Sequence, residues 1–419
     1  MNRKKNTTGK KKRQDEYKNA AKYVVYLLRC ALNQIDIKDF PINCTWDEIW
    51  KLVEWNQIEA LIGIYIQGYR EVIPEEIRKT GKRVYNETLY RQLCFDVERE
   101  KIIKNLEEQK LAHLMLKGVN ISKYYPITGT RWMSDNDILC GFIQRDEREG
   151  YRRKGTAEEE IQYWEKKTHD AIQIAMEKSG FVLSQSGICH DSYIKQPMFK
   201  FEMHHQLFQK SFDEVANRYY ENPWKYALSD EQSPYLYHYS KEDEYIFFIT
   251  HAYKHFSVSG SGIRTLVDVY VYIKNNMSMD WDYISSQMKI LELEKFEKLL
   301  RNTALHVFSL QGKMTTDEWN TVFYMIGSGT FGTSHNRIKH YLEKVGTDKK
   351  NSKNKKWCYI KNRLWLDENT INEHYPFFYR HRWLRLFMPL YRVIKGLLIH
   401  PKKIWTEWRI LFRIVRTDK

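Results

Sequence analysis

Two aspartates one residue apart, at the head of a short apolar run, constrain the fold of this chain more than any other feature. Asp135 and Asp137 lead directly into Ile138 and Leu139. In an extended strand side chains alternate between two faces, so the two carboxylates project to the same side. Two carboxylates held together repel each other, and we therefore expect a positive group between them. The pattern predicts a buried strand with an acidic end.

Apolar runs on both sides of this pattern predict a small sheet between helical regions. The runs at 112–117 and 137–142 are short and apolar, which is typical of buried strands. A charged helix is expected over about 157–179. Three strands are expected after it, in GFVLSQSG, HDSYIKQ and MFKFEMHHQL, with tight turns between them. Residues from about 16 to 112 and from about 212 to 311 show helical periodicity instead. The predicted class is α+β.

Composition divides the chain into consecutive segments. They are a basic disordered tail (1–15), an N-terminal helical region (16–84), an α/β core (85–215), a helical region that completes the cleft (216–326), a loop and basic linker (327–375) and basic amphipathic helices (376–419). The stretch GSGTFGTSH at 327–335 has the glycine content of a phosphate-binding loop. A single Gly-rich loop is weak evidence, however, and we expect a flexible connector there.

The positive charge of the chain is confined to its two ends. The net charge is +15 at pH 7, yet residues 1–13 hold seven Lys and Arg with no acid, and residues 380–419 hold eleven against two acids. The body between them is close to neutral. It offers no second basic surface, which argues against a nucleic-acid partner. The six cysteines show no CxxC pair, which favours a reducing cytoplasm and argues against a cysteine-based zinc site.

The C-terminal segment 376–419 leaves two interpretations open. Arg and Lys alternate there with Trp, Phe and Leu, which is typical of a basic amphipathic helix on an anionic membrane. The same pattern fits helices that pack on the core with their basic side chains reaching solvent. Pro389, Gly396 and Pro401 break the segment into short pieces. Helical spacing predicts one continuous apolar face from about 402 to 416, formed by Ile404, Trp405, Trp408, Leu411, Phe412 and Val415.

A third acid completes a pattern that can bind a metal ion. In the predicted strand KFEMH, Phe201 and Met203 face one way, and Glu202 and His204 face the other. Oxygen ligands of this kind can hold Mg²⁺, whose shell is completed by waters and substrate phosphates. A two-metal phosphoryl-transfer site takes a third carboxylate from a neighbouring strand. From spacing alone, a loop D-x-D motif with a solvated strand acid at Glu202 stays an open alternative.

These motifs resemble the DNA polymerase β-like nucleotidyltransferase superfamily, in which a small-residue turn precedes a D-x-D strand and a later strand carries a third acid. More closely, about residues 85–275 are similar to a bacterial family of uncharacterised nucleotidyltransferases found in polysaccharide and peptide-modification gene clusters. The resemblance implies that Asp135, Asp137 and Glu202 are the catalytic and metal-binding residues. It implies nucleotide-binding residues at Lys117, Gly118 and Arg131. It also implies that the residues lining the cleft include His204, His251, His255, Arg264 and Asp268.

Two pairs among these residues have plainer explanations in the sequence. His251 and His255 share a helix face, but Ala252 follows the first histidine where zinc proteases carry glutamate, which argues against a histidine metal site. Packing histidines are the alternative to cleft-lining ones. Arg264 and Asp268 are also four residues apart, and without the resemblance they would be expected to form a helix-surface ion pair worth ~0.3–0.5 kcal/mol.

The resemblance implies a small mixed β-sheet nucleotidyltransferase core flanked by N-terminal and C-terminal helical regions. It implies metal-dependent transfer of a nucleoside monophosphate from an NTP, with Mg²⁺ or Mn²⁺ as cofactor and ATP as the favoured nucleotide. The acceptor is unidentified, and a small molecule, a glycan precursor and a peptide are all compatible. Two alternatives stay open: a non-catalytic, membrane-peripheral scaffold that keeps the fold, and an RNA-modifying nucleotidyltransferase. We expect a cytoplasmic protein, with peripheral membrane contact through 376–419 as an open alternative.

Overall fold

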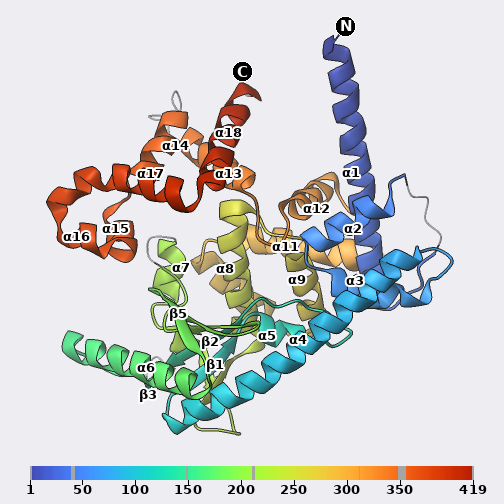
Figure 1. Ribbon diagram of the computed structural model, residues 1–419. Coiled ribbons are helices and arrows are strands. Elements are labelled where there is room, and N and C mark those ends of the chain that lie inside the picture. Colours follow the sequence, from blue (N-terminus) through green and yellow to red (C-terminus); the bar gives the residue numbers. More distant parts are fainter. Residues whose placement is uncertain are drawn as a thin grey trace.

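The computed structural model of the chain describes residues 2–38, 43–147, 150–209, 213–310, 312–347 and 355–417. Figure 1 shows a central sheet with helices around it and further helices towards both termini. The N-terminal helices are α1 (Asn2–Asn33), α2 (Trp46–Trp55), α3 (Glu59–Tyr65), η1 (Ile66–Gly68) and α4 (Glu75–Glu108).

Helix α1 begins earlier than the sequence composition predicts. It includes residues 2–15, which we expected to form a disordered tail. Lys, Arg, Gln and Glu are good helix formers, so this polar segment can extend a helix that already exists. The later part of α1 supplies that helix, because Ala21, Val24 and Leu28 are buried in the main core.

One mixed sheet of seven strands lies within the described residues, in the order β5-β6-β7-β2-β1-β9-β8. Its strands are β1 (Ala112–Leu116), β2 (Asn136–Gly141), β5 (Val182–Ser186), β6 (His190–Lys195), β7 (Phe199–His204), β8 (Ala227–Ser229) and β9 (Leu236–Tyr239). Strand β2 runs antiparallel to β1 and parallel to β7, and β9 runs parallel to β1. A separate hairpin consists of β3 (Ile143–Asp146) and β4 (Gly150–Arg153). The α+β architecture predicted from the sequence is confirmed.

The sheet differs from the sequence prediction at the edge formed by β9 and β8. The predicted strands correspond to β1, β2, β5, β6 and β7, whereas β8 and β9 lie in a region that we expected to be helical. Both are short, and β9 gains its place by pairing with β1, which lies more than a hundred residues earlier in the chain. Local periodicity carries little information about such a distant pairing.

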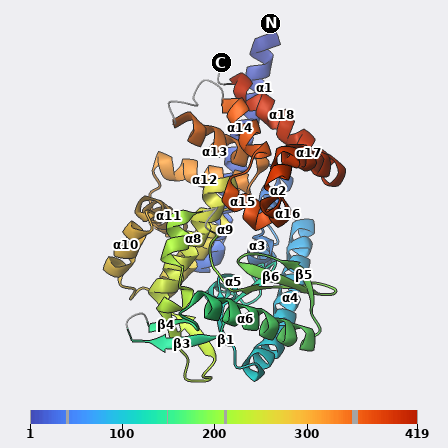
Figure 2. The same cartoon turned by 90° about the vertical axis from the view of Figure 1, so that its left-hand side faces the viewer.

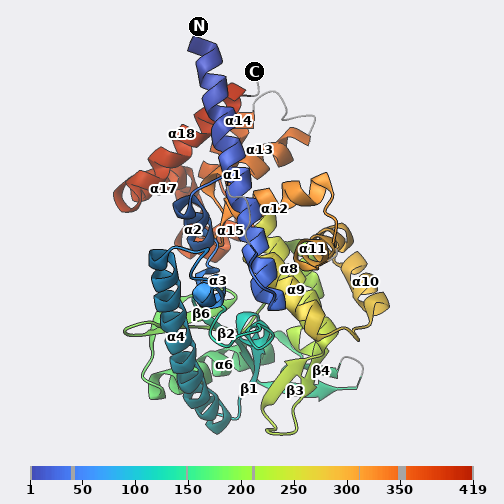
Figure 3. The same ribbon diagram turned by 90° about the vertical axis from the view of Figure 1, so that its right-hand side faces the viewer.

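Two helical layers cover opposite faces of the sheet (Figures 1 and 3). On one face, α4 and α6 (Glu158–Lys178) bury Phe95 and Ile172 together with Ile138 of β2 and Phe201 of β7. On the other face lie α5 (Gly118–Ser122), α8 (Lys241–Ser259) and α9 (Arg264–Asn275), and Leu139 of β2 belongs to their core. Because strand side chains alternate, the odd-numbered positions of β2 face α8 and α9.

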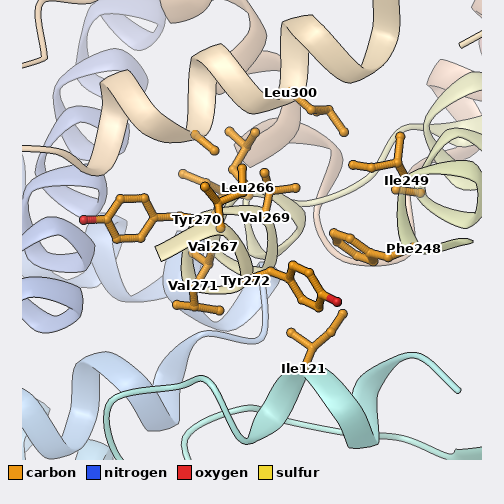
Figure 4. Close-up of a cluster of buried hydrophobic side chains, with 14 of the residues drawn as sticks. Ile121, Phe248, Ile249, Leu266, Val267, Val269, Tyr270, Val271, Tyr272 and Leu300 are labelled. Carbon is orange, nitrogen blue, oxygen red and sulfur yellow. The ribbon is translucent and has the colours of Figure 1, made fainter. Parts of the chain in front are cut away.

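Helix α9 is the centre of the second layer. Figure 4 shows the buried side chains around it, which come from α9 itself and from α5, α8 and α11 (Glu294–Phe308). The labelled residues are Ile121, Phe248, Ile249, Leu266, Val267, Val269, Tyr270, Val271, Tyr272 and Leu300. This packing on several sides fixes the start of α9, which carries two of the candidate site residues.

The remaining helices follow the sheet along the chain. They are α7 (Glu214–Tyr219), η2 (Pro223–Tyr226), α10 (Trp281–Ile290), α12 (Thr316–Ser328), α13 (Ser334–Thr347), α14 (Lys355–Leu364), α15 (Glu368–His374), α16 (Pro376–Arg380), η4 (Arg382–Phe387), α17 (Met388–Ile399) and α18 (Pro401–Thr417). Residues 348–354 of the expected basic linker lie outside the described residues. Of the helices that the structure describes, none has both the length and the apolar character needed to cross a membrane.

Candidate active site

The three candidate metal acids come from one edge of two neighbouring parallel strands. Asp137 lies on β2 directly beside Glu202 on β7, and Leu139 lies beside His204 in the same register. Asp135 comes just before β2 begins. Phe201 and Met203 on one face of β7 pack in the core formed with α4 and α6. Glu202 and His204 lie on the opposite face, which faces α8 and α9. The alternation predicted from the sequence is therefore present in the structure.

Asp137 is buried and held by two partners. Lys117 Nζ and His204 Nε2 each lie 2.8 Å from Asp137 Oδ1. Burial alone would raise the pKa of Asp137, but Lys117 and His204 outweigh it and hold that pKa well below the usual range. Lys117 and His204 thus favour the ionised form of Asp137 on the site wall. Lys117 is the positive group that the D-x-D pattern leads us to expect.

Lys117 occupies the turn between β1 and α5, with a φ of 53° that places it in the left-handed region. The next residue, Gly118, has no room for a side chain, because a Cβ atom there would lie 2.5 Å from Arg131 Nη1. The turn is thus pressed against the Arg131 guanidinium. Only glycine at position 118 lets the backbone of this turn lie so close to Arg131, which is a physical reason for the Lys-Gly pair.

Glu202 and Asp135 share a second lysine. Lys200 Nζ bonds Glu202 Oε1 and lies 3.9 Å from Asp135 Oδ2. His190 Nε2 on β6 lies 3.6 Å from Glu202 Oε2, and His204 Nε2 lies 3.8 Å from the same oxygen. Burial raises the pKa of Asp135, and the negative charges of Asp137 and Glu202 raise it further. A cation bound nearby would offset the repulsion that Asp137 and Glu202 exert on Asp135.

Arg131 contacts an acid of the helical layer. Its Nε and Nη2 atoms bond Asp268 Oδ1 and Oδ2 at 2.8 and 2.9 Å, and the Tyr125 hydroxyl donates to Asp268 Oδ1 at 2.7 Å. All three residues are buried. This bidentate pair ties the segment before β2 to α9, and it directs Nη1 towards Gly118.

The expected ion pair between Arg264 and Asp268 is replaced by different contacts. Arg264 Nη1 donates to Gln57 Oε1 at 2.9 Å and to the carbonyl of Trp132 at 3.2 Å. Asp268 pairs with Arg131 instead. Arg264 and Asp268 do lie on one helix face, as their spacing of four residues predicts. Each side chain nevertheless bonds to a residue outside α9.

Two histidines and a lysine of α8 face the carboxylates across the site. His251 Nε2 and His255 Nε2 lie 3.4 Å apart. Burial and the nearby cations lower the pKa of His251 well below its usual range and lower that of His255 to about 4. Both imidazoles are therefore neutral at physiological pH. Between them, Lys254 adds a cation to the same wall, and burial lowers its pKa.

A cavity of about 540 Å³ connects these groups. All of the candidate residues named from the sequence line it: Lys117, Gly118, Arg131, Asp135, Asp137, Glu202, His204, His251, His255, Arg264 and Asp268. Its mouth includes Phe331, an exposed side chain of the α12–α13 connection. The Gly-rich segment that we expected to be only a connector therefore contributes to the cavity wall.

Two hydroxyl groups in this cavity are buried without a hydrogen-bond partner among the described residues. They are Ser261 Oγ, between α8 and α9, and Thr330 Oγ1, in the Gly-rich segment. A buried hydroxyl without a partner loses the hydrogen bonds it would make in water. Both hydroxyls thus have unused hydrogen-bonding capacity close to the cavity.

The sequence pattern missed several residues of this site, including His190, Lys200, Lys254, Ser261 and Thr330. A signal for one of them was present. Strands β6 and β7 form an antiparallel hairpin in which the first residue of β6, His190, lies opposite His204. Assigning that hairpin register from its short turn would have placed His190 beside the third acid. The two hydroxyls lie on loops, where no periodicity points to them.

The donor groups at this site fit a hard divalent cation. Both contacts of Asp137 use Oδ1, and no described residue donates a hydrogen bond to its Oδ2. Three carboxylates on one cavity wall provide the oxygen ligands that Mg²⁺ and Mn²⁺ prefer, with space for water and phosphate oxygens. Asp135, Asp137 and Glu202 are the residues that would hold such an ion.

Comparison with known proteins places this arrangement in a family. Residues 43–309 match the family described as "Uncharacterised nucleotidyltransferase". No curated protein and no solved structure matches the chain. The matched range covers well over half of the chain and contains every candidate site residue from Lys117 to Asp268. The chain therefore belongs to the uncharacterised nucleotidyltransferase family, whose general reaction is nucleotidyl transfer.

Proposed function

We propose that this protein transfers a nucleoside monophosphate from an NTP, with ATP as the favoured substrate, to an acceptor oxygen and releases pyrophosphate. The reaction requires Mg²⁺ or Mn²⁺. The observation that carries the proposal is the register of β2 and β7, which brings Asp137 beside Glu202 at a cavity that Asp135 also lines.

The charge distribution around the cavity suits a triphosphate substrate. One wall carries three carboxylates, and the groups around them include Lys117, Lys200 and Lys254. A triphosphate brings about four negative charges, so it requires both the lysines and bound cations to offset its charge. When bound, the divalent ion polarises the phosphate oxygens and stabilises charge on the attacking and leaving oxygens.

The chemistry exchanges one phosphorus–oxygen bond for another. The acceptor oxygen bonds to the α-phosphorus, the bond from that phosphorus to the oxygen bridging the β-phosphate breaks, and pyrophosphate leaves with the bond electrons. The acceptor hydroxyl must also lose its proton. Glu202 is the group we assign to take that proton or to lower the acceptor's pKa, because it lines the cavity beside Asp137.

The basic residues have separate positioning roles in this proposal. Lys117 holds Asp137 in one orientation through its 2.8 Å contact and offsets charge on the nucleotide. Arg131 is committed to Asp268, so we assign it to shaping the Gly118 turn against which the phosphates lie. The unpartnered hydroxyls of Ser261 and Thr330 are hydrogen-bonding groups for the polar parts of the substrate.

The test is transfer of label from α-phosphate-labelled ATP, GTP, CTP or UTP to components of a cell lysate, followed together with pyrophosphate release. The full-length protein with Mg²⁺ is expected to label a discrete acceptor from one preferred NTP. The isosteric Glu202→Gln variant should retain the melting temperature and lose turnover by about 10²–10⁴-fold.

The matched control is Glu165→Gln, which changes a half-exposed acid on α6 outside this cavity. It should leave transfer unchanged. If Glu202→Gln keeps full turnover, Glu202 is a solvated strand acid and its catalytic assignment fails. If no NTP gives label or pyrophosphate with any lysate, the enzymatic proposal itself is contradicted.

A further inference from the structure

The C-terminal helices carry a large share of the exposed large apolar side chains of the described residues. Figures 1 and 2 show α16, α17 and α18 at one end of the molecule, far from the β3–β4 hairpin. On α17, Leu390, Ile394 and Leu398 are 60%, 48% and 77% exposed. They are spaced by four residues, so they form a stripe along one helix face. The exposed residues nearby are Phe377, Trp383, Leu386, Phe387, Leu397, Ile399, Trp405 and Trp408.

The inner side of this segment is anchored to the body of the protein. Leu411 of α18 is buried with Ile338 and Leu342 of α13 and with Tyr359 of α14. Glu407 is buried beside Arg337 of α13. The anchoring uses one side of α18 and leaves Trp405, which is 68% exposed, on the outside.

This arrangement corrects the apolar face predicted over about 402–416. Leu411 is buried, whereas Trp405 and Trp408 are exposed. The single apolar face that helical spacing predicted therefore includes residues with different surroundings. The side chains of Phe412 and Val415 lie outside the described part of the chain.

Positive charges accompany the exposed apolar side chains. Lys395, Lys402, Arg409 and Arg413 are all exposed on α17 and α18. The acids of this region with described contacts are already engaged: Asp367 caps α15, Glu368 pairs with Arg382 and Arg385, and Glu407 pairs with Arg337 and Arg363. The surface therefore combines apolar area with a net positive charge.

A groove of about 450 Å³ opens on this same surface between α14, α17 and α18. Its walls include Val393, Leu397 and Ile404, and Trp408 lies at its edge, while Arg363 and Arg392 contribute cationic groups. Leu397 and Trp408 are partly exposed and also line the groove, so the groove is continuous with the exposed apolar surface. An acyl chain below an anionic headgroup has the matching chemistry.

We propose that α16, η4, α17 and α18 form a peripheral docking surface for an anionic phospholipid bilayer. The occupant is identified by charge complementarity, because a second copy of the chain would bring the same positive charges against this surface. Apolar side chains insert at the headgroup boundary, and each nearby Lys or Arg strengthens attraction to anionic lipid. This inference stands independently of the catalytic proposal.

Vesicle sedimentation of the full-length protein tests the proposal. The protein is expected to sediment with vesicles of equal parts phosphatidylglycerol and phosphatidylcholine, and not with pure phosphatidylcholine. It should be released in about 1 M sodium chloride, where the Debye length is roughly 3 Å. Two surface variants, Lys402→Glu with Arg409→Glu and Leu398→Ser with Trp405→Ser, should each bind at least about tenfold more weakly.

A matched control reverses one charge and removes one exposed apolar side chain elsewhere: Lys51→Glu with Met277→Ser. It should bind as the wild type does. Equal melting temperatures show that the variants are folded. Absence of binding to anionic vesicles, equal binding to neutral ones, or full binding by either surface variant overturns the proposal. So does a lipid-free dimer that Leu398→Ser with Trp405→Ser converts to a monomer, because the surface then belongs to a second copy.

Discussion

At the scale of single residues, Asp135 and Asp137 carry the same chemical group in different surroundings. Asp137 is buried and bonded to Lys117, whose side chain is also largely buried, whereas Asp135 is partly exposed at the cavity. Asp137→Asn removes the carboxylate that balances a buried lysine. It should lower the free energy of unfolding by about 3–5 kcal/mol. Asp135→Asn should change it little, because crowding and burial already raise the pKa of Asp135 and disfavour its charge.

Urea unfolding of the two variants measures this difference. The comparison is internally matched, since each variant exchanges one carboxylate oxygen for an amide nitrogen. Equal destabilisation by the two substitutions would contradict the assigned role of Lys117.

A partly buried acid outside the cavity predicts a pH dependence of stability. Burial, with a smaller contribution from the nearby Glu54, raises the pKa of Glu59 on α3 to about 7. The folded state therefore holds a proton that the unfolded chain releases near pH 4.5, and stability falls as pH rises between these values. Glu59→Gln removes the ionisable group. The difference between its free energy of unfolding and that of the wild type should increase from about pH 4.5 to 7 and stay constant above pH 7.

Denaturation series at several pH values check this behaviour. The control is Glu71→Gln, which replaces an exposed acid. The control should follow the wild type at every pH. A constant difference between Glu59→Gln and the wild type across the range would show that Glu59 ionises normally in the folded protein.

The sequence predicted which residues come together at the cavity better than it predicted their contacts. Alternation along β2 and β7 placed Asp137, Glu202 and His204 on one face, because a strand has only two faces to choose between. The partner that helical spacing alone offered Asp268 was Arg264, and the structure pairs Asp268 with Arg131 instead. A helix neighbour at i+4 is always available, but Arg131 reaches the same carboxylate from a segment 137 residues away and forms a bidentate, buried pair.

At the scale of secondary-structure elements, the β1–α5 turn connects the sheet to the helical layer. Gly118→Ala places a methyl group against the Arg131 guanidinium, which cannot move freely because Asp268 holds it. The substitution should cost about 1–3 kcal/mol of stability and reduce turnover, since the turn must shift. Gly68→Ala is the matched control, because its added methyl meets no atom within 4 Å.

Thermal melts and pyrophosphate release on both variants give the result. A Gly118→Ala protein as stable and active as Gly68→Ala would mean that Arg131 yields easily and that the turn is not shaped by close approach.

The elements that were predictable from the sequence are those with a strong local pattern. Apolar runs identified β1 and β2, and turns on either side identified β5, β6 and β7. Strands β8 and β9 have only three and four residues, and their place depends on the pairing of β9 with β1. In α18, periodicity gave the helix, but it could not tell which apolar side chains meet α13.

At the scale of the whole molecule, the cavity lies where the strand edge, the start of α9 and the loops around α8 and α12 meet. Two neighbouring strands, β2 and β7, supply the carboxylates, and segments later in the chain supply the opposite wall. Packing on the core and contact with a membrane, the two interpretations of the C-terminal segment, apply to different sides of that segment. One side of α18 packs on α13 and α14, and the exposed side carries the surface proposed to dock on lipid.

The central claim is that this cavity binds an NTP with a divalent ion held by the three acids. Calorimetric titration of the full-length protein with a non-hydrolysable ATP analogue, with Mg²⁺ and with excess EDTA, tests it most directly. Binding is expected only with Mg²⁺, and Asp135→Asn should weaken it at least tenfold at unchanged stability, which corresponds to about 1.4 kcal/mol. Removing Asp137 as well, as in Asp135→Ala with Asp137→Ala, should abolish it. Binding that is equally tight in EDTA and in Asp135→Asn would contradict the claim.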